Sequence, residues 1–141
     1  MDVIMRRLTK DDKHYIDELQ KSRGFNGVPD YFYSSTCEWV MYGAFCDDKL
    51  VSMVALFPYR RLPHKDYPHG YIAELGSMYT MPEYQYRGIA TNLLRKMLSN
   101  IKNDLPLLDA IVADSTEDAY DIYEHFGFKN STEYRQWYPL Y

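Results

Sequence analysis

The spacing of hydrophobic positions along the chain predicts four helices. In the segment Ile89–Asn103, apolar residues recur every three or four positions, so one face of a helix would be buried. Near the N-terminus, Thr9 and Asp12 have the spacing of a capping box, with Asp in the place of the usual Glu or Gln, and predict the start of another helix. The expected helices cover residues 9–22, 30–38, 89–103 and 118–126.

Apolar and polar residues that alternate with a period of two predict a set of strands. They are expected at Val3–Leu8, Trp39–Cys46, Leu50–Phe57, Tyr71–Met81 and Leu107–Ala113, followed after Phe128 by one or two closing strands that include Tyr134–Tyr138. The turn residues Asp47-Asp48-Lys49 make the second and third of these strands a hairpin. Pro58–Gly70 contains three prolines and is expected to be a loop without regular structure, of a length that is often functional in a small domain.

The most informative motif is the run Gln85-Tyr86-Arg87-Gly88-Ile89-Ala90, which links a strand to the longest helix. A strand that turns through Gly88 into a helix directs free backbone N–H groups and the positive end of the helix at one point, where a phosphate or pyrophosphate can bind. The run is neither a Walker loop, since no Lys-Ser/Thr follows it, nor a dinucleotide fingerprint with three glycines. Taken alone, it fits equally well a tight turn that needs Gly88 only for its backbone.

Two further features stand at fixed distances from this run. Glu74 lies eleven residues before Gln85 on the preceding strand, and the pattern Ala-x-x-x-Tyr-x-x-x-Gly-Phe, from Ala119 through Tyr123 to Phe128, closes the last helix. The order and spacing of these parts resemble the GNAT N-acetyltransferase superfamily. The resemblance is carried by residues 71–128 and is looser over residues 1–70.

The resemblance implies an α/β GNAT-like fold in one domain that spans residues 1–141. That fold has a mixed, mostly antiparallel central sheet of six to seven strands, flanked by about four helices. The implied activity is transfer of the acetyl group of acetyl-CoA, the cosubstrate, directly to a primary amine. No metal is implied.

The resemblance also assigns the residues that would hold acetyl-CoA. The backbone N–H groups from Gln85 through Tyr86, Arg87, Gly88, Ile89 and Ala90 would bind the pyrophosphate. The backbones of Met78 and Thr80 would pair with the pantetheine arm, and the Met78 N–H would stabilise the thioester oxyanion. Many members contact CoA with an Asn at the position of Thr116; here a hydroxyl stands there, which could equally cap the helix.

Two side chains are candidates for proton transfer. Glu74 is the expected general base, because its spacing to Gln85 matches family members that use a Glu at this position. A carboxylate in an apolar strand is costly unless it is partnered, and burial would raise its pKa toward a useful value. The alternative is a Glu on a solvent-facing or salt-bridged position. Tyr123 is the expected general acid for the departing thiolate, and its alternative is a packed aromatic side chain.

Composition limits the remaining function classes. The net charge is −4, and the excess of acidic over basic residues lies in the second half of the chain, which argues against non-specific nucleic-acid binding. No apolar run is long enough to span a bilayer and no apolar stretch follows the first arginines, so a cytoplasmic protein is expected. The acceptor is a small-molecule or peptide amine that the sequence does not identify, and a homodimer through the aromatic C-terminal strand fits the family. The alternative function is a non-catalytic CoA-binding sensor or interaction module on the same fold.

Overall fold

A computed structural model of the chain describes residues 2–113, 117–129 and 139. Within these residues it has five strands and three α-helices: β1 (Ile4–Leu8), α1 (Lys13–Ser22), β2 (Val40–Cys46), β3 (Lys49–Arg60), β4 (Tyr71–Thr80), α2 (Ile89–Asp104), β5 (Ala110–Ala113) and α3 (Glu117–His125). Short 3-10 helices cover Lys10–Asp12, Asp30–Tyr33 and Pro82–Tyr84. The mixed α/β architecture expected from the sequence is confirmed, with fewer strands and helices in the described part than the six to seven and four expected.

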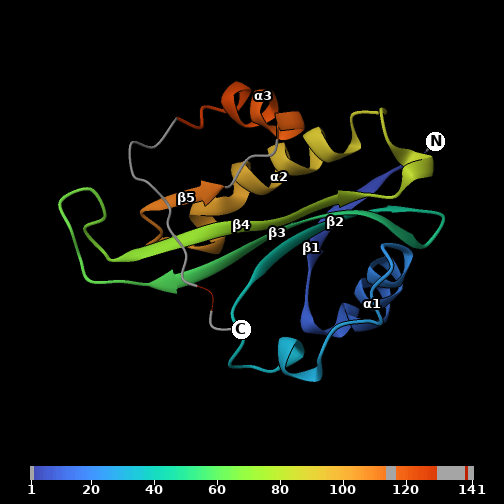
Figure 1. Ribbon diagram of the computed structural model, residues 1–141, viewed down its shortest axis with the longest axis horizontal. Helices are drawn as coiled ribbons and strands as arrows, with labels where there is room; N and C mark the ends of the chain where they lie inside the picture. Colours follow the sequence, from blue (N-terminus) through green and yellow to red (C-terminus); the bar gives the residue numbers. More distant parts are fainter. Residues whose placement is uncertain (1, 114–116, 130–138, 140–141) are drawn as a thin grey trace.

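The strands form one sheet in the order β1-β2-β3-β4-β5. The first four pair antiparallel, and β5 joins β4 in parallel. Figure 1 shows α1 against one face of the sheet and α2 and α3 against the other. A strand of alternating residues that is covered on both faces becomes buried throughout, as β2 is from Val40 to Cys46.

Each face of the sheet has its own hydrophobic core. On the α2 side, Leu93, Leu94 and Met97 of α2 pack against alternate residues of β2, β3 and β4. On the α1 side, Ile16 and Leu19 of α1 pack against the intervening residues, such as Val51 and Met53. The sheet therefore separates two layers of side chains, and the parity of a residue along its strand decides which layer it enters.

Three sequence predictions differ from the structure. Regular structure was expected to stop before Pro58, yet β3 continues through Pro58 to Arg60. Proline is tolerated there because β2 pairs with β3 only as far as Leu56, so no strand in the described part of the chain needs an N–H from residue 58 on that edge. Within residues 30–38 only the 3-10 helix Asp30–Tyr33 forms, and the strand expected at Leu107–Ala113 is limited to Ala110–Ala113. The expected strand Tyr134–Tyr138 lies outside the described residues.

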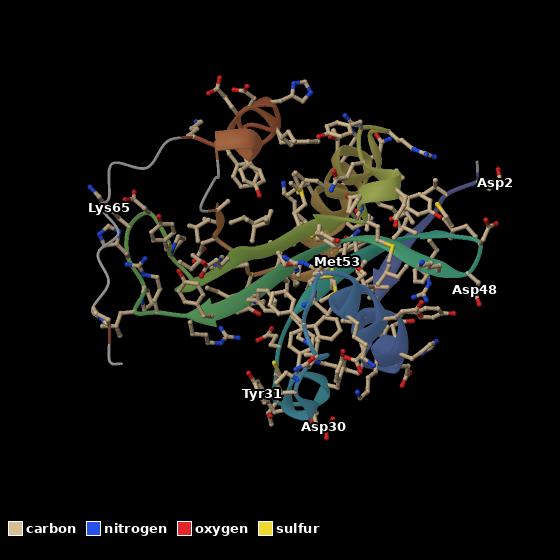
Figure 2. All side chains as sticks on the ribbon, turned by 45° about the vertical axis from the view of Figure 1, so that its right-hand side comes forward. Asp2, Asp30, Tyr31, Asp48, Met53 and Lys65 are labelled. Carbon is tan, nitrogen blue, oxygen red and sulfur yellow. The ribbon has the colours of Figure 1, made fainter. Side chains whose placement is uncertain are left out.

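The β2–β3 turn follows the prediction. Asp47 and Asp48 have φ angles of 50° and 60°, the left-handed pair that a two-residue hairpin needs. At the opposite end of the molecule, the loop that joins β3 to β4 carries Lys65 far from Asp2 and Asp48, as Figure 2 shows. No helix in the described residues has the length and apolarity to cross a membrane.

The β3–β4 loop is fixed at its base by a buried carboxylate. Asp109, just before β5, accepts hydrogen bonds from the backbone N–H groups of His69 and Tyr71, and its Oδ1 lies 2.8 Å from His69 Nδ1. The Asp109 N–H in turn donates to the Tyr71 carbonyl at 2.8 Å. These bonds hold the pKa of Asp109 below its usual value against the opposing effect of burial. The start of β4 and the start of β5 are thereby locked together.

The predicted capping box is present and includes an ion pair. The Thr9 N–H donates to Asp12 Oδ2 at 2.8 Å, and Arg6 Nη2 donates to Asp12 Oδ1 at 2.8 Å. The Arg6 hydrogen bonds, and to a lesser extent the Thr9 amide, hold the pKa of the Asp12 carboxyl below its usual value although burial opposes them. The contact thus joins β1 to the start of α1.

We expect Asp12→Asn to lower the free energy of unfolding at pH 7 by about 1–2 kcal/mol, since it removes a cap and an ion pair. A lowered pKa stabilises the fold above the unfolded value of about 3.9, and that stabilisation is lost as the pH falls through the folded pKa. Urea unfolding of the two proteins should therefore differ at pH 7, and the difference should shrink as the pH falls below the unfolded pKa of about 3.9. The control is Asp11→Asn on the neighbouring exposed carboxylate, and an equal loss in the control would contradict the assignment.

Candidate functional site

The strand β4 has a β5 partner along only half of its length. The parallel pairing joins Ile72–Leu75 to Ala110–Ala113, and within the described residues β5 does not continue beside Gly76–Thr80. The other edge of β4 stays paired with β3 throughout. Apart from the Thr80 carbonyl, which accepts a hydrogen bond from Gln85 Nε2, the N–H and C=O groups on this edge of Gly76–Thr80 have no partner strand among the described residues. A ligand that can act as a strand could pair with them.

A bulge in β4 lies directly after Leu75, the last residue that pairs with β5. Ala55 of β3 pairs with Ser77, while the next residue, Leu56, pairs with Leu75, so Gly76 is an extra residue in β4. A side chain at this position would overlap the ring of Phe57. Glycine is therefore required here, and the bulge resets which residues of β4 face each layer.

Glu74 faces the α1 side of the sheet. Its neighbours Ala73 and Leu75 both belong to the core under α2, and residues that alternate along a strand point to opposite faces. Glu74 lies in register with Phe57 of β3 and Val112 of β5, and its side chain is half-buried. A carboxylate is thus placed on one face, one residue before the strands separate.

Met78 and Thr80 lie on the part of β4 that β5 leaves. Met78 packs against the core under α2. The Thr80 hydroxyl lies 2.8 Å from the Ser52 hydroxyl, and the Thr80 carbonyl accepts a hydrogen bond from Gln85 Nε2 at 3.1 Å. These contacts position the strand end and link it to the turn that follows.

The turn before α2 leaves backbone donors without a side-chain cap. Gly88 is the N-cap residue of α2, with φ 75°, and no side chain caps the helix. The first intrahelical bond runs from the Asn92 N–H to the Gly88 carbonyl at 3.0 Å, so the N–H groups of Ile89, Ala90 and Thr91 have no partner within the helix. The first turn contains no acidic residue. This end of α2 fits a pyrophosphate, because donors and the helix dipole act together there.

The turn also holds a strained residue. Tyr86 has φ 63° although it is not glycine, and its side chain is fully exposed, so no packing of the ring accounts for the conformation. At Gly88, an added Cβ would find only Asn92 Nδ2, at 3.9 Å, so the space in front of the turn is open. Two left-handed residues on either side of Arg87 form the kind of N–H concavity that binds anions.

Tyr123 on α3 is buried in the core under α2. It is 6% exposed and belongs to the same cluster as Leu75 and Met97. Burial raises the pKa of its phenol, which keeps the group protonated at neutral pH. Tyr123 and Glu74 therefore lie on opposite sides of the sheet.

The spacing Tyr-x-x-x-Gly-Phe has a structural cause of its own. The N–H of Phe128 donates to the Tyr123 carbonyl at 3.0 Å, and the N–H of Gly127 donates to the Glu124 carbonyl at 3.0 Å. With Gly127 at φ 93° and the Tyr123 and Phe128 rings 5.3 Å apart, this is a Schellman motif with its hydrophobic contact. The ring of Tyr123 is used by the cap, whereas its hydroxyl is not.

One expected residue cannot be placed, and one residue near the site was missed. Thr116 lies outside the described residues. Arg23, at the end of α1, reaches the part of β4 beyond the bulge, where Nη1 lies 3.3 Å from the Ser77 hydroxyl. Nothing in the local sequence marks this contact, because its partners are 54 residues apart.

We expect the two left-handed residues of the turn to respond oppositely to substitution. Gly88→Ala should lower the free energy of unfolding by about 1 kcal/mol, because a Cβ is disfavoured at that φ. Tyr86→Gly should raise it by about 0.5 kcal/mol, because relief of the same strain exceeds the entropy cost of glycine. Urea unfolding of the matched pair measures both, and changes of the same sign would contradict this geometry.

Comparison with known proteins agrees with this geometry. A family model for the acetyltransferase (GNAT) domain matches residues 5–130. No curated protein matches the chain.

Solved structures share the fold at low identity. A protein from Clostridium acetobutylicum described as a predicted acetyltransferase, crystallised with acetyl-CoA, has a TM-score of 0.77 and 16% identity over 97% of this chain and 96% of its own. A GCN5-related N-acetyltransferase from Ralstonia eutropha JMP134 has a TM-score of 0.75 and 14% identity, covering 96% and 97%. An aminoglycoside acetyltransferase from an uncultured soil metagenomic sample, in complex with sisomicin, has a TM-score of 0.74 and 12% identity, covering 99% and 97%. The match of the family model over most of the chain shows that this protein belongs to the GNAT acetyltransferase family.

Proposed function

We propose that this protein transfers the acetyl group of acetyl-CoA to a primary amine. The observation that carries the proposal concerns the half of β4 that has no partner on its β5 side among the described residues. This half leads directly into the N-terminus of α2, which has no side-chain cap. The same continuous stretch of chain offers strand-like hydrogen bonding and then an anion site. A long cosubstrate with an amide-containing arm and a pyrophosphate needs both, in that order.

The roles at the cosubstrate site follow from this layout. The Gln85 N–H, expected to be the first donor, instead donates to the Pro82 carbonyl at 3.3 Å. The N–H groups from Tyr86 to Ala90 hold the pyrophosphate, and the backbones of Met78 and Thr80 hold the pantetheine arm. The Met78 N–H donates to the thioester oxygen as negative charge develops on it. Acetyl-CoA supplies the activated acetyl group. Thr116 is proposed as an additional contact.

Glu74 is the proposed general base. Its half-buried position on the α1 face, one residue before the strands separate, supports removal of a proton from an ammonium group that approaches from that side. The irregular segment 25–37 lies on the same side, where Figure 2 shows Asp30 and Tyr31 below the sheet. We propose that this segment contributes to the acceptor site.

Tyr123 is the proposed general acid for the departing sulfur. A phenol is protonated at neutral pH, so Tyr123 can donate a proton to the thiolate and does not act as a base. Burial raises the pKa of Tyr123, which weakens it as an acid, so the proposal rests on its position and not on its pKa. Tyr123 lies under α2, on the other side of the sheet from Glu74. This location supports separate roles, in which Glu74 takes the proton of the amine and Tyr123 gives a proton to the sulfur.

Binding of the cosubstrate is tested by a thermal-shift titration of the purified protein. Acetyl-CoA and CoA should each raise the melting temperature in a saturable way, equivalent to about 2.7 kcal/mol at one hundred times Kd, while ATP should not. No shift at millimolar acetyl-CoA would contradict the proposed site. A shift without acetylation of any amine in a broad panel would instead support a CoA-binding module without catalysis.

The two candidate catalytic groups are tested by substitution. Glu74→Gln and Tyr123→Phe should each lower the rate of amine acetylation by about 10²-fold or more, because each removes a proton-transfer group. Tyr123→Phe should keep the acetyl-CoA thermal shift and most of the stability, since the Schellman motif uses the ring and not the hydroxyl.

The matched control is Tyr42→Phe, which removes a phenol from the same core cluster. The Tyr42 hydroxyl donates to Asp104 Oδ2 at 2.7 Å at the far end of α2, so its loss should lower stability with little effect on the rate. Turnover near wild type in Tyr123→Phe would rule out its role as the acid.

A further inference from the structure

We infer that the acceptor amine carries an anionic group, a carboxylate or a phosphate, and that Arg23 recognises it. This inference rests on the proposed function and adds the chemical class of the acceptor. It starts from the position of one guanidinium on the α1 face of β4.

Arg23 is held in place by aromatic and neutral polar groups. Its Cζ lies 4.6 Å from the ring centroid of Tyr79 on β4 and 5.5 Å from that of Phe25. Nη1 donates to the Ser77 hydroxyl at 3.3 Å and to Gln20 Oε1 at 3.1 Å. The cation is thus oriented by stacking and by two hydrogen bonds from a single nitrogen.

The charge of Arg23 has no carboxylate partner among the side chains of residues 2–113 and 121–129. The arginines of β1 differ in this respect: Arg6 pairs with Asp12 at 2.8 Å, and Arg7 pairs with Asp104 at 3.1 Å. A guanidinium has five N–H donors in a planar fork that matches a carboxylate or a phosphate. A half-buried arginine oriented only by neutral groups retains most of its capacity to bind an anion.

Its location relates it to the proposed reaction. Ser77 and Tyr79 follow Glu74 on β4, beyond the bulge, and Tyr79 packs against the α1-side core. At about 3.3 Å per strand residue, Ser77 lies about 10 Å along the strand from Glu74. Phe25, whose ring centroid lies 5.5 Å from the guanidinium carbon, is 55% exposed. An acceptor whose amine contacts Glu74 could therefore reach Arg23 with an anionic group, if about one extended six-carbon chain separates that group from the amine.

A purely structural role for Arg23 makes a different prediction. As a brace between α1 and β4, it would contribute to stability and would have no influence on which amine reacts. Selectivity between an anionic amine and its neutral counterpart separates the two roles.

The test uses two matched pairs of amines with the full chain and saturating acetyl-CoA. The carboxylate pair is 6-aminohexanoate and 6-aminohexanamide, and the phosphate pair is 6-aminohexyl phosphate and 6-amino-1-hexanol. For the wild type we expect kcat/KM to favour the anionic member of at least one pair by about tenfold or more, chiefly through KM. The pair that shows the preference identifies the anion.

In Arg23→Gln the anionic and neutral members of each pair should have about equal kcat/KM, whereas Lys21→Gln should keep the preference for the anionic member. The control removes an equal charge from an exposed position on the same helix. The acetyl-CoA thermal shift of each variant reports that its fold and cosubstrate site are intact.

Equal acetylation of both members of each pair by the wild type, or a preference that survives in Arg23→Gln, would overturn this inference and leave the proposed function standing. No acetylation of any of the four amines, despite an acetyl-CoA shift, would overturn the anionic acceptor of this length. No acetylation across a broad amine panel would overturn the proposed function as well.

Discussion

Backbone hydrogen bonding along β4 is the constraint on which the site depends. Every N–H and C=O group in a sheet needs a partner. In the part of the chain that the structure describes, β5 pairs with β4 only as far as Leu75, while the other edge of β4 stays paired with β3. The bulge at Gly76 follows directly on the last residue that pairs with β5, and the Phe57 ring occupies the space that a side chain at Gly76 would need. Among the described residues, the edge of β4 without a partner is a short stretch that ends at the turn before α2. In the proposed function, this stretch, the turn and the helix bind one ligand continuously.

Much of this arrangement could be predicted from local patterns. Period-two alternation located β2, β3 and β4, and the aspartates at 47 and 48 located the hairpin turn, because both signals depend only on neighbours in the sequence. The face of Glu74 follows from the same alternation once the buried residues around it are known. The family followed from the order of motifs rather than from any single one.

Other features could not be predicted because they depend on distant partners. Pro58 is tolerated in β3 only because β2 has already ended at that level of the sheet. Arg23 gains its significance from Tyr79 and Ser77, which no pattern within α1 indicates. The left-handed Tyr86 departs from the propensity of its residue type, and such departures are expected where function constrains the backbone. Even the Tyr-x-x-x-Gly-Phe spacing is explained by the way the helix ends. The Tyr123 hydroxyl is the part of the motif that the helix cap does not use.

The placement of Glu74 and Tyr123 on opposite sides of the sheet has a consequence for proton traffic. In the proposed reaction one group gains a proton and the other loses one, and the sheet lies between their two layers of side chains. The proton removed from the amine is therefore not the proton delivered to sulfur. Each group must be reset by its own exchange with water, Glu74 by releasing a proton on the α1 side and Tyr123 by regaining one from the side of α2 and α3. Before the next turnover, each group would exchange its proton with water by its own route, and the two groups would not share one proton relay.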